Sequence, residues 1–255
     1  MDPLLDFTGQ VAMITGAASG FGRLLAQGLA MRGCNLVIGD INPDELDITL
    51  NSLQLKKNKA IAVTCDVSDE SQVKHMVDTA ISHFDRLDIG VNNAGIAHSM
   101  TPLHEIEQHT LDKQMAVNVN GVMYGMKHQI AVMLKQGAGH IVNLSSMAGI
   151  GGAPKGAAYS AAKHAVVGLT RTAAVEYARK GIRANAICPF YSPTNILATD
   201  GFDSPQSQER LARGCPMRRL AQPQEVVNTM ILILSPGNSY MSGQTIAIDG
   251  AVSAW

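Results

Sequence analysis

The sequence predicts an α/β fold in which helices cover both faces of a doubly wound, mostly parallel sheet of seven strands. Short apolar runs alternate with longer segments of helical pattern, and this alternation is typical of a parallel sheet with right-handed crossovers. The runs are short and almost wholly apolar, which indicates strands buried on both faces. A glycine-rich turn between the first run and the first helical segment is typical of the same class.

The amino-terminal half of the chain supplies four of the predicted strands. Each is a short apolar run, such as Val11-Ala12-Met13-Ile14. The runs cover residues 11–14, 35–39, 60–65 and 87–91, and the helical patterns between them cover residues 22–31, 43–55 and 70–83. Because a helix separates each strand from the next, neighbouring strands are expected to run in the same direction.

The carboxyl-terminal half continues this order with longer helices. Strands are predicted at residues 140–144, 182–187 and 244–248, and helices at residues 111–135, 159–179 and 223–234. The stretch from 190 to 218 interrupts the order, because it is rich in Ser, Pro, Thr and Asp and shows no regular pattern. It is either a disordered insert or a lid over a site, and its length inside a compact domain favours the lid.

The composition indicates one globular domain, residues 1–255, with a large core. Hydrophobic residues make up 46% of the chain and charged residues 16%, and no repeat or linker-like break divides it. The net charge of −1 and the lack of a basic block do not suggest a nucleic-acid partner. No apolar run approaches the roughly 20 residues of a membrane span, and the amino terminus lacks the features of a secretion signal.

The four cysteines are scattered at Cys34, Cys65, Cys188 and Cys215, with no C-x-x-C and no Cys/His cluster. Reduced thiols are therefore expected rather than disulfides or a metal site. The cytoplasm is the expected location.

The segment Tyr159-Ser160-Ala161-Ala162-Lys163 contains the most informative pair in the chain. Its tyrosine and lysine lie four residues apart, so they share one face of a helix and can touch. A tyrosine hydroxyl has a pKa of about 10 and is a poor base at neutral pH, but a neighbouring ammonium lowers that pKa. The pair is either an acid–base unit or an ordinary surface contact.

Ser146 strengthens the first interpretation, because it precedes Tyr159 by thirteen residues, a spacing that Ser145 does not have. The other tyrosines lack a lysine four positions later: Tyr124, Tyr177, Tyr191 and Tyr240. His98, which follows the fourth strand, is expected in a loop or on the wall of a substrate pocket.

A glycine-rich loop, Thr15 to Gly22, connects the first strand to the first helix with the spacing G-x-x-x-G-x-G. Its glycines let the backbone turn tightly and approach a pyrophosphate, and the following helix offers free N–H groups and a partial positive charge. The alternative is that the glycines only permit close packing.

Asp40 closes the second strand, where an acid in a dinucleotide fold accepts hydrogen bonds from the ribose hydroxyls and repels a 2′-phosphate. Ser19 and Ile41 provide no positive charge to offset it, and Arg23 lies within the helix. The sequence therefore favours NAD over NADP. The alternative is that Asp40 caps a turn.

These motifs, in this order, resemble the short-chain dehydrogenase/reductase family, whose members have a single-domain Rossmann fold. The resemblance covers about Phe7 to Gly250. It includes the loop T-G-x-x-x-G-x-G and the Ser, Tyr and Lys described above. The other matching segments are Cys65-Asp66-Val67, Asn92-Asn93-Ala94-Gly95, Val117-Asn118-Val119, and Asn185-Ala186-Ile187-Cys188-Pro189 with Thr194.

The resemblance implies an NAD-dependent alcohol dehydrogenase or carbonyl reductase that acts on a small alcohol or ketone. The implied catalytic residues are Asn118, Ser146, Tyr159 and Lys163, with Asn120 as a rival to Asn118. The implied NAD contacts are Gly16, Ser19, Gly20, Phe21, Gly22, Asp40, Asp66, Val67, Asn93, Gly95, Tyr159, Lys163, Pro189 and Thr194. Many relatives are tetramers joined through the two long helices, so a homotetramer or homodimer is expected.

Two positions depart from the family pattern. Phe190 stands where the family usually has glycine after Pro189, and Ala251 replaces the second glycine of D-G-G. Both changes concern the shape of the substrate pocket rather than the catalytic positions. Two other functions stay open: a dinucleotide sensor without turnover, and an epimerase or dehydratase of nucleotide sugars.

Overall fold

A computed structural model describes residues 2–53, 55, 59–199, 202 and 204–254. Within them seven strands form one sheet in the order β3-β2-β1-β4-β5-β6-β7, and every neighbouring pair is parallel. The strands are β1 (Val11–Thr15), β2 (Asn35–Asp40), β3 (Ala60–Thr64), β4 (Ile89–Asn92), β5 (Gly139–Leu144), β6 (Ile182–Pro189) and β7 (Thr245–Ile248).

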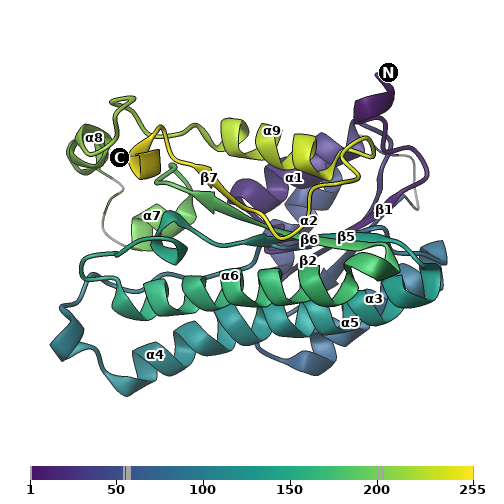
Figure 1. The fold of residues 1–255 in the computed structure, drawn as a ribbon, viewed down its shortest axis with the longest axis horizontal. Coiled ribbons are helices and arrows are strands. Elements are labelled where there is room, and N and C mark those ends of the chain that lie inside the picture. Colours follow the sequence, from purple (N-terminus) through teal and green to yellow (C-terminus); the bar gives the residue numbers. More distant parts are fainter. Residues whose placement is uncertain (1, 54, 56–58, 200–201, 203, 255) are drawn as a thin grey trace.

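Helices cover both faces of this sheet (Figure 1). One face is covered by α1 (Gly20–Ala30), α2 (Pro43–Ser52) and α9 (Pro223–Leu234), whose apolar residues share one core cluster. The other is covered by α3 (Glu70–Phe84), α5 (Gly121–Gln136) and α6 (Ala157–Tyr177), which share a second cluster. The shorter helices are α4 (Gln108–Met115), α7 (Asn195–Thr199) and α8 (Pro205–Arg213).

Burial on both faces of the sheet explains why the first four residues of β1, Val11 to Ile14, are apolar. All five of its residues are buried, with Val11 and Met13 in one core cluster and Ala12 and Ile14 in the other. Burying a large aliphatic side chain contributes about 1.5–3 kcal/mol, so a strand covered on both faces gains from every residue. The doubly wound α/β fold predicted from the sequence is confirmed.

The chain winds in opposite directions from β1, because β2 and β3 lie on one side of it and β4 to β7 on the other. At such a reversal, the loops that leave the carboxyl ends of the neighbouring strands separate and open a crevice. The glycine-rich loop after β1 and the segments after β4 and β5 all begin at this edge.

Several element boundaries differ from the prediction. The sheet is parallel throughout rather than mostly parallel, and β6 extends to Pro189, which pairs in register with Ile248. The helix predicted at residues 111–135 begins at Gln108 and is interrupted by a π-helical turn, Ala116–Asn120. Such turns leave the regular hydrogen-bond ladder locally, which the apolar periodicity does not reveal.

The stretch from 190 to 218, predicted to be irregular, contains α7 and α8. Ser204 caps α8 through a hydrogen bond from Ser207 N, and Pro205 occupies the first helical turn. This capping pattern is a local helix start that the Ser- and Pro-rich composition concealed. Residues 200, 201 and 203 of the predicted lid lie outside the described residues.

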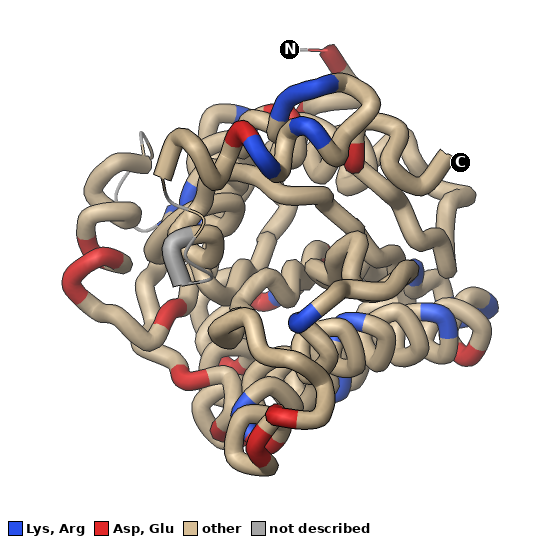
Figure 2. The backbone as a smooth tube through the Cα atoms, turned by 90° about the vertical axis from the view of Figure 1, so that its left-hand side faces the viewer, with Lys and Arg blue, Asp and Glu red and all other residues tan. Residues whose placement is uncertain are grey.

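Charged residues are distributed over many elements. Figure 2 shows acidic and basic positions scattered along the described backbone without a continuous basic stripe. Among the described helices, none combines the length and apolar character needed to cross a membrane.

Candidate active site

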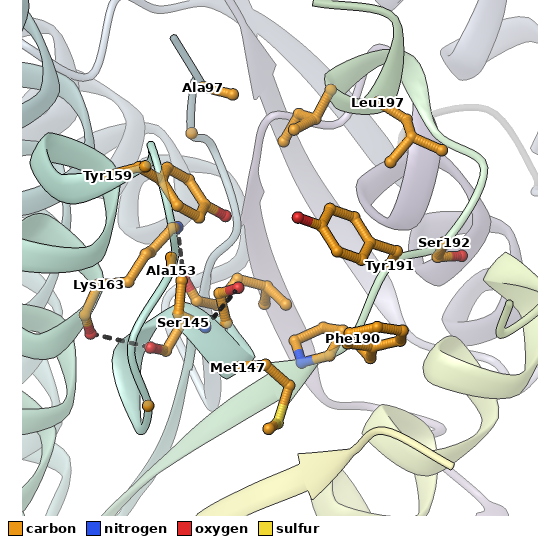
Figure 3. Close-up of a pocket in the computed structure, with 18 of the residues that line it drawn as sticks. Ala97, Ser145, Met147, Ala153, Tyr159, Lys163, Phe190, Tyr191, Ser192 and Leu197 are labelled. Atoms are coloured by element: carbon orange, nitrogen blue, oxygen red, sulfur yellow. Dashed lines mark hydrogen bonds between the residues drawn. The ribbon is translucent and has the colours of Figure 1, made fainter. Parts of the chain in front are cut away.

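A cavity of about 590 Å³ opens at the carboxyl edge of the sheet (Figure 3). Its lining comes from the segments after β4 and β5, from the first turns of α6, and from the segment after β6. Its volume is in the range of small-molecule and cofactor sites.

Tyr159 and Lys163 lie on one face of α6, as their spacing predicted. The Lys163 amine is 5.5 Å from the centre of the Tyr159 ring and donates to Leu144 O at 2.8 Å. Figure 3 shows the Tyr159 hydroxyl pointing into the cavity. Burial lowers the pKa of Lys163 from its ordinary value to about 8. An amine with that pKa can gain or lose a proton near neutral pH, next to a phenol.

The two adjacent serines have different surroundings. Ser145 is buried, and its hydroxyl donates to Lys163 O at 2.9 Å, which fixes α6 against the end of β5. Ser146 is half-buried on the cavity wall, and its Oγ accepts a hydrogen bond from Ala148 N at 3.1 Å. That bond does not use the Ser146 hydroxyl proton, which can be donated to a molecule in the cavity.

Asn118 lies in the π-helical turn and is fully buried. Its Oδ1 accepts from Ile96 N at 2.9 Å, and its Nδ2 donates to Ile96 O at 2.9 Å and to Gln114 Oε1 at 2.7 Å. A Cβ on Gly95 would lie 2.8 Å from Asn118 Oδ1 and 3.3 Å from Lys163 Nζ. Asn118 Oδ1 and Lys163 Nζ therefore both lie close to the same side of the Gly95 backbone. Asn118 contacts the segment after β4 rather than the cavity itself.

The glycine-rich loop adopts a shape that side chains would prevent. Gly16 and Gly20 have φ angles of +66° and +52°, in the left-handed region that favours glycine. A Cβ on Gly22 would collide with the carbonyl of Gly16. Asn93 Nδ2 donates to both Thr15 O and Gly16 O at 2.9 Å, so the segment after β4 holds this loop in place.

The loop has the form of a dinucleotide phosphate cradle. It leads into α1, whose amino terminus follows Ser19, and the N–H groups there suit a pyrophosphate. Phe21 lines the cavity, and a Cβ on Gly20 would lie 3.6 Å from Thr194 across it. The loop and the segment after β6 therefore come close together beside the cavity, and the N–H groups at the start of α1 fit the pyrophosphate of a nicotinamide dinucleotide.

Asp40 has the turn-capping contacts that were the alternative to ribose binding in the sequence analysis. It caps a turn, because its Oδ2 accepts from Ala18 N at 3.0 Å and its Oδ1 from Asn42 N at 3.1 Å. A carboxylate has about four acceptor positions, so two remain for ribose hydroxyls. The neighbouring Arg23 pairs with Glu45 at 2.6 Å and donates to Thr49 at 2.9 Å, so its charge is engaged by α2.

The predicted site residues separate into two groups. Those that line the cavity are Phe21, Asn93, Gly95, Ser146, Tyr159, Lys163, Pro189 and Thr194. Those that surround it at the same edge of the sheet are Gly16, Ser19, Gly20, Gly22, Asp40, Asp66, Val67 and Asn118. In the second group, Asp66 accepts from Ser68 N at 2.9 Å, and Val67 packs against Gly121.

Sequence reasoning missed much of the wall opposite Tyr159. Ala153 and Val252 line the cavity and had been assigned no role. Tyr191 and Leu197 also line it, and they had been predicted only as part of the lid segment 190–218, without an individual role in the pocket. The position of Tyr191 directly after Pro189 and Phe190, at the end of β6, was the available signal.

Three further side chains line the cavity, of which His98 had been expected there or in a loop. The other two are Met100 and Met147. The Nδ1 of His98 bonds to Ser99 O at 2.8 Å, and its Nε2 is buried without a hydrogen-bond partner among the described residues.

Comparisons with known proteins match nearly the whole chain. A family model described as enoyl-(acyl carrier protein) reductase matches residues 16–253. The chain is 39% identical over 248 residues to cis-4-hydroxycyclohexanecarboxylate dehydrogenase of Sinomonas cyclohexanicum, with 97% of this chain and 98% of the relative covered. It is 35% identical to cyclohexanol dehydrogenase of Acinetobacter sp. (strain SE19), with 97% of this chain and 96% of the relative covered.

A solved structure agrees with these matches. The crystal structure of levodione reductase superimposes with a TM-score of 0.92 at 34% identity and covers 97% of this chain and 99% of its own. The sequence matches, the fold and the shared cavity of Ser146, Tyr159 and Lys163 all indicate the same family. The chain belongs to the short-chain dehydrogenase/reductase family of oxidoreductases, which move a hydride between a nicotinamide dinucleotide and an alcohol or carbonyl group.

Proposed function

We propose that the protein is an NAD-dependent dehydrogenase of secondary alcohols on small alicyclic rings and, in the reverse direction, a reductase of the corresponding ketones. The observation that supports this most directly is that Ser146, Tyr159 and Lys163 line the same largely apolar cavity, with the Lys163 amine beside the Tyr159 ring and the Tyr159 hydroxyl pointing into the cavity.

In the oxidising direction, the Tyr159 oxygen accepts the proton of the substrate hydroxyl as the carbinol carbon loses its hydride. The bound nicotinamide supplies the hydride chemistry. The Lys163 ammonium favours the phenolate form of Tyr159, since a positive charge close to a phenol lowers its pKa. In the reducing direction, Tyr159 returns the proton to the developing alkoxide.

Ser146 and Asn118 support this proton transfer in different ways. The Ser146 hydroxyl donates to the substrate oxygen and stabilises the negative charge that develops on it. Asn118 is a positioning residue, because it hydrogen-bonds both backbone groups of Ile96 and lies, like Lys163 Nζ, next to Gly95.

NAD is the proposed cofactor because of Asp40 and Arg23. The Asp40 carboxylate closes β2 and would repel a 2′-phosphate. Arg23, the basic side chain on the adjacent turn of α1, is paired with Glu45 and therefore does not offset that repulsion.

The alicyclic substrate class is supported by the cavity and by two relatives. Ala97, Met147, Ala153 and Leu197 provide apolar surface around the cavity. The names of two relatives refer to hydroxylated cyclohexane rings. A compact apolar ring carrying one hydroxyl suits a wall of this kind.

Three further features belong to the proposal. The segment 190–218 acts as a lid on the cavity, since Phe190, Tyr191 and Leu197 line it.

The chain forms a homotetramer, or a homodimer, through α5 and α6, where Met123 and Val175 are exposed. Light scattering of the purified protein tests the assembly.

The cytoplasm is the proposed location. All four cysteines are free and buried, which suits a reducing compartment.

The central test replaces Tyr159 by Phe and follows the absorbance of NADH during oxidation of cyclohexanol. We expect Tyr159→Phe to lower kcat by about 10²- to 10⁴-fold while NADH still binds, because only the proton-transferring oxygen is removed. Tyr177→Phe, on the same helix, is the control. Turnover by Tyr159→Phe within a few-fold of the unsubstituted protein would contradict the mechanism. A protein that binds NADH but turns over no alcohol or ketone would instead support the dinucleotide sensor.

The cofactor proposal is tested by kcat/KM with NAD⁺ and NADP⁺. Asp40→Asn keeps an oxygen for Ala18 N but removes the charge, so we expect the preference for NAD⁺ to fall by about 10-fold or more. Asp44→Asn, on the exposed first turn of α2, is the control. Equal use of the two cofactors by the unsubstituted protein would show the assignment to be wrong.

A further inference from the structure

The segment after β6 brings a second tyrosine into the cavity. Tyr191 lines it from the side opposite α6, and Figure 3 shows its hydroxyl pointing toward that of Tyr159. A ligand that fills the space between the two rings would therefore have one phenol at each end.

Aromatic packing determines the direction of the Tyr191 ring. Phe190 meets it edge-on with ring centres 4.9 Å apart, and Phe202 meets it at a tilt with ring centres 5.9 Å apart. Both distances are within the range in which aromatic pairs attract each other. The ring is thereby positioned from two sides.

The backbone next to Tyr191 is fixed as well. Tyr191 O accepts from Ala221 N at 3.3 Å, and Phe190 N donates to Ile248 O at 3.0 Å. The following Ser192 is buried and donates through its Oγ to Ala221 O at 2.8 Å. The hydroxyl of Tyr191 therefore projects from a fixed support, which a specificity-determining group needs.

The surroundings of the two tyrosines indicate different tasks. Tyr159 has the Lys163 amine beside its ring, whereas the residue four positions after Tyr191 is Asn195. Tyr191 therefore lacks the sequence pattern that would make it a base. A neutral phenol donates and accepts hydrogen bonds, and on a mainly apolar wall one such group fixes the orientation of a ligand.

We propose that Tyr191 is a specificity-determining residue that hydrogen-bonds a second oxygen of the substrate, on the side of the ring opposite the reacting carbinol. This inference rests on the proposed function, since it assumes that the reacting oxygen lies at Tyr159. It narrows the substrate class to alicyclic alcohols and ketones with a second hydroxyl, carbonyl or carboxylate group across the ring.

The test compares cyclohexanol, which has one oxygen, with trans-cyclohexane-1,4-diol, which has two on opposite sides of the ring. With saturating NAD⁺, we expect Tyr191→Phe to lower kcat/KM for the diol by about 5-fold and to change kcat/KM for cyclohexanol by less than about 2-fold, because a typical hydrogen bond contributes about 1 kcal/mol. Tyr240→Phe is the matched control, since Tyr240 is fully exposed.

The outcomes separate this proposal from the proposed function. Equal changes for the two alcohols in Tyr191→Phe, or no change for either, would overturn the role of Tyr191 while leaving the dehydrogenase activity intact. Lack of turnover by the unsubstituted protein would count against the proposed function. In that case, calorimetric titration of the NAD⁺ complex with the diol tests whether Tyr191 binds the second oxygen. Weaker binding by Tyr191→Phe than by Tyr240→Phe supports its role, and equal or undetectable binding overturns it.

Discussion

The two walls of the cavity are held in place by different forces. The cofactor wall, residues 15–22 and 92–95, is fixed by hydrogen bonds to backbone, such as those from Asn93 to Thr15 and Gly16. The substrate wall, residues 190–197, is positioned largely by side-chain packing among Phe190, Tyr191, Leu197 and their neighbours Phe202 and Leu220.

This difference indicates how one scaffold keeps its reaction while its substrate changes. Backbone hydrogen bonds and glycines specify a single loop shape, and few substitutions leave that shape intact. Packed apolar side chains tolerate replacement by others of similar volume at modest cost, so the substrate wall can be reshaped without disturbing the cofactor wall. Substitutions in the cofactor wall should therefore have larger effects than substitutions in the substrate wall.

The strongest test of the comparison is Gly22→Ala in the cofactor wall. The added Cβ would collide with the backbone carbonyl of Gly16, which cannot move away by a side-chain rotation. Overpacking of this kind costs about 1–3 kcal/mol, so we expect NADH to bind about 5- to 150-fold more weakly in a fluorescence titration.

Gly168→Ala is the control for this variant, because no atom lies within 4 Å of the added carbon on α6. Its affinity for NADH should be unchanged. Near-normal binding by Gly22→Ala would show that the loop is not as rigid as the comparison requires.

Gly95→Ala sharpens the comparison by separating binding from catalysis. Its Cβ would press on Asn118 Oδ1 and approach Lys163 Nζ, so the proton-transfer residues move while the glycine-rich loop does not. We expect kcat to fall by about 10-fold, with NADH affinity changed less than about 3-fold.

Steady-state kinetics and NADH titration of Gly95→Ala provide the two readouts, and Gly168→Ala is again the control, since its added carbon on α6 meets no atom within 4 Å. A loss confined to NADH affinity would show that Gly95 acts on the cofactor and not on the catalytic group.

A buried histidine in the sheet beneath both walls should make the stability of the fold depend on pH. His140 on β5 is buried against Arg183, and burial followed by the Arg183 charge lowers its pKa from 6.5 to about 3. In the unfolded chain His140 binds its proton at a higher pH than in the folded protein. The contribution of His140 to the free energy of unfolding is therefore fully present above about pH 6.5 and is lost as the pH decreases toward 3. The expected slope from this group is about 1.4 kcal/mol per pH unit.

Urea denaturation of His140→Gln at pH 7, 6 and 5 measures that contribution. The variant should lose less stability on acidification than the unsubstituted protein, whereas His104→Gln, at an exposed position, should behave like the unsubstituted protein. The same slope in all three proteins would exclude His140 as the source of acid sensitivity.

The smallest effect is expected from Phe190→Ala in the substrate wall. Loss of its edge contact with Tyr191 costs about 0.5–1.5 kcal/mol, so KM for the alcohol should rise by about 2- to 10-fold. NADH affinity should stay within about 2-fold. Phe190→Tyr keeps the ring and should keep the KM. A large loss of NADH affinity in Phe190→Ala would break the distinction between the walls.

The sequence by itself determined the fold class and the placement of Tyr159 beside Lys163, because both depend on local spacing. A four-residue interval places Tyr159 and Lys163 on one helical face whatever surrounds them, and continuous apolar runs such as β1 must be covered on both sides. The glycine-rich loop was equally readable, since its shape requires particular residues at particular positions.

Only the tertiary structure decided how distant segments meet. Tyr191 turns its hydroxyl into the cavity because Phe190 and Phe202 pack on its ring, and Arg23 turns toward α2 because Glu45 lies there. No periodicity predicts such contacts. They depend on the three-dimensional positions that the completed sheet and helices give to residues far apart in the chain, so the substrate wall became visible only in the folded protein.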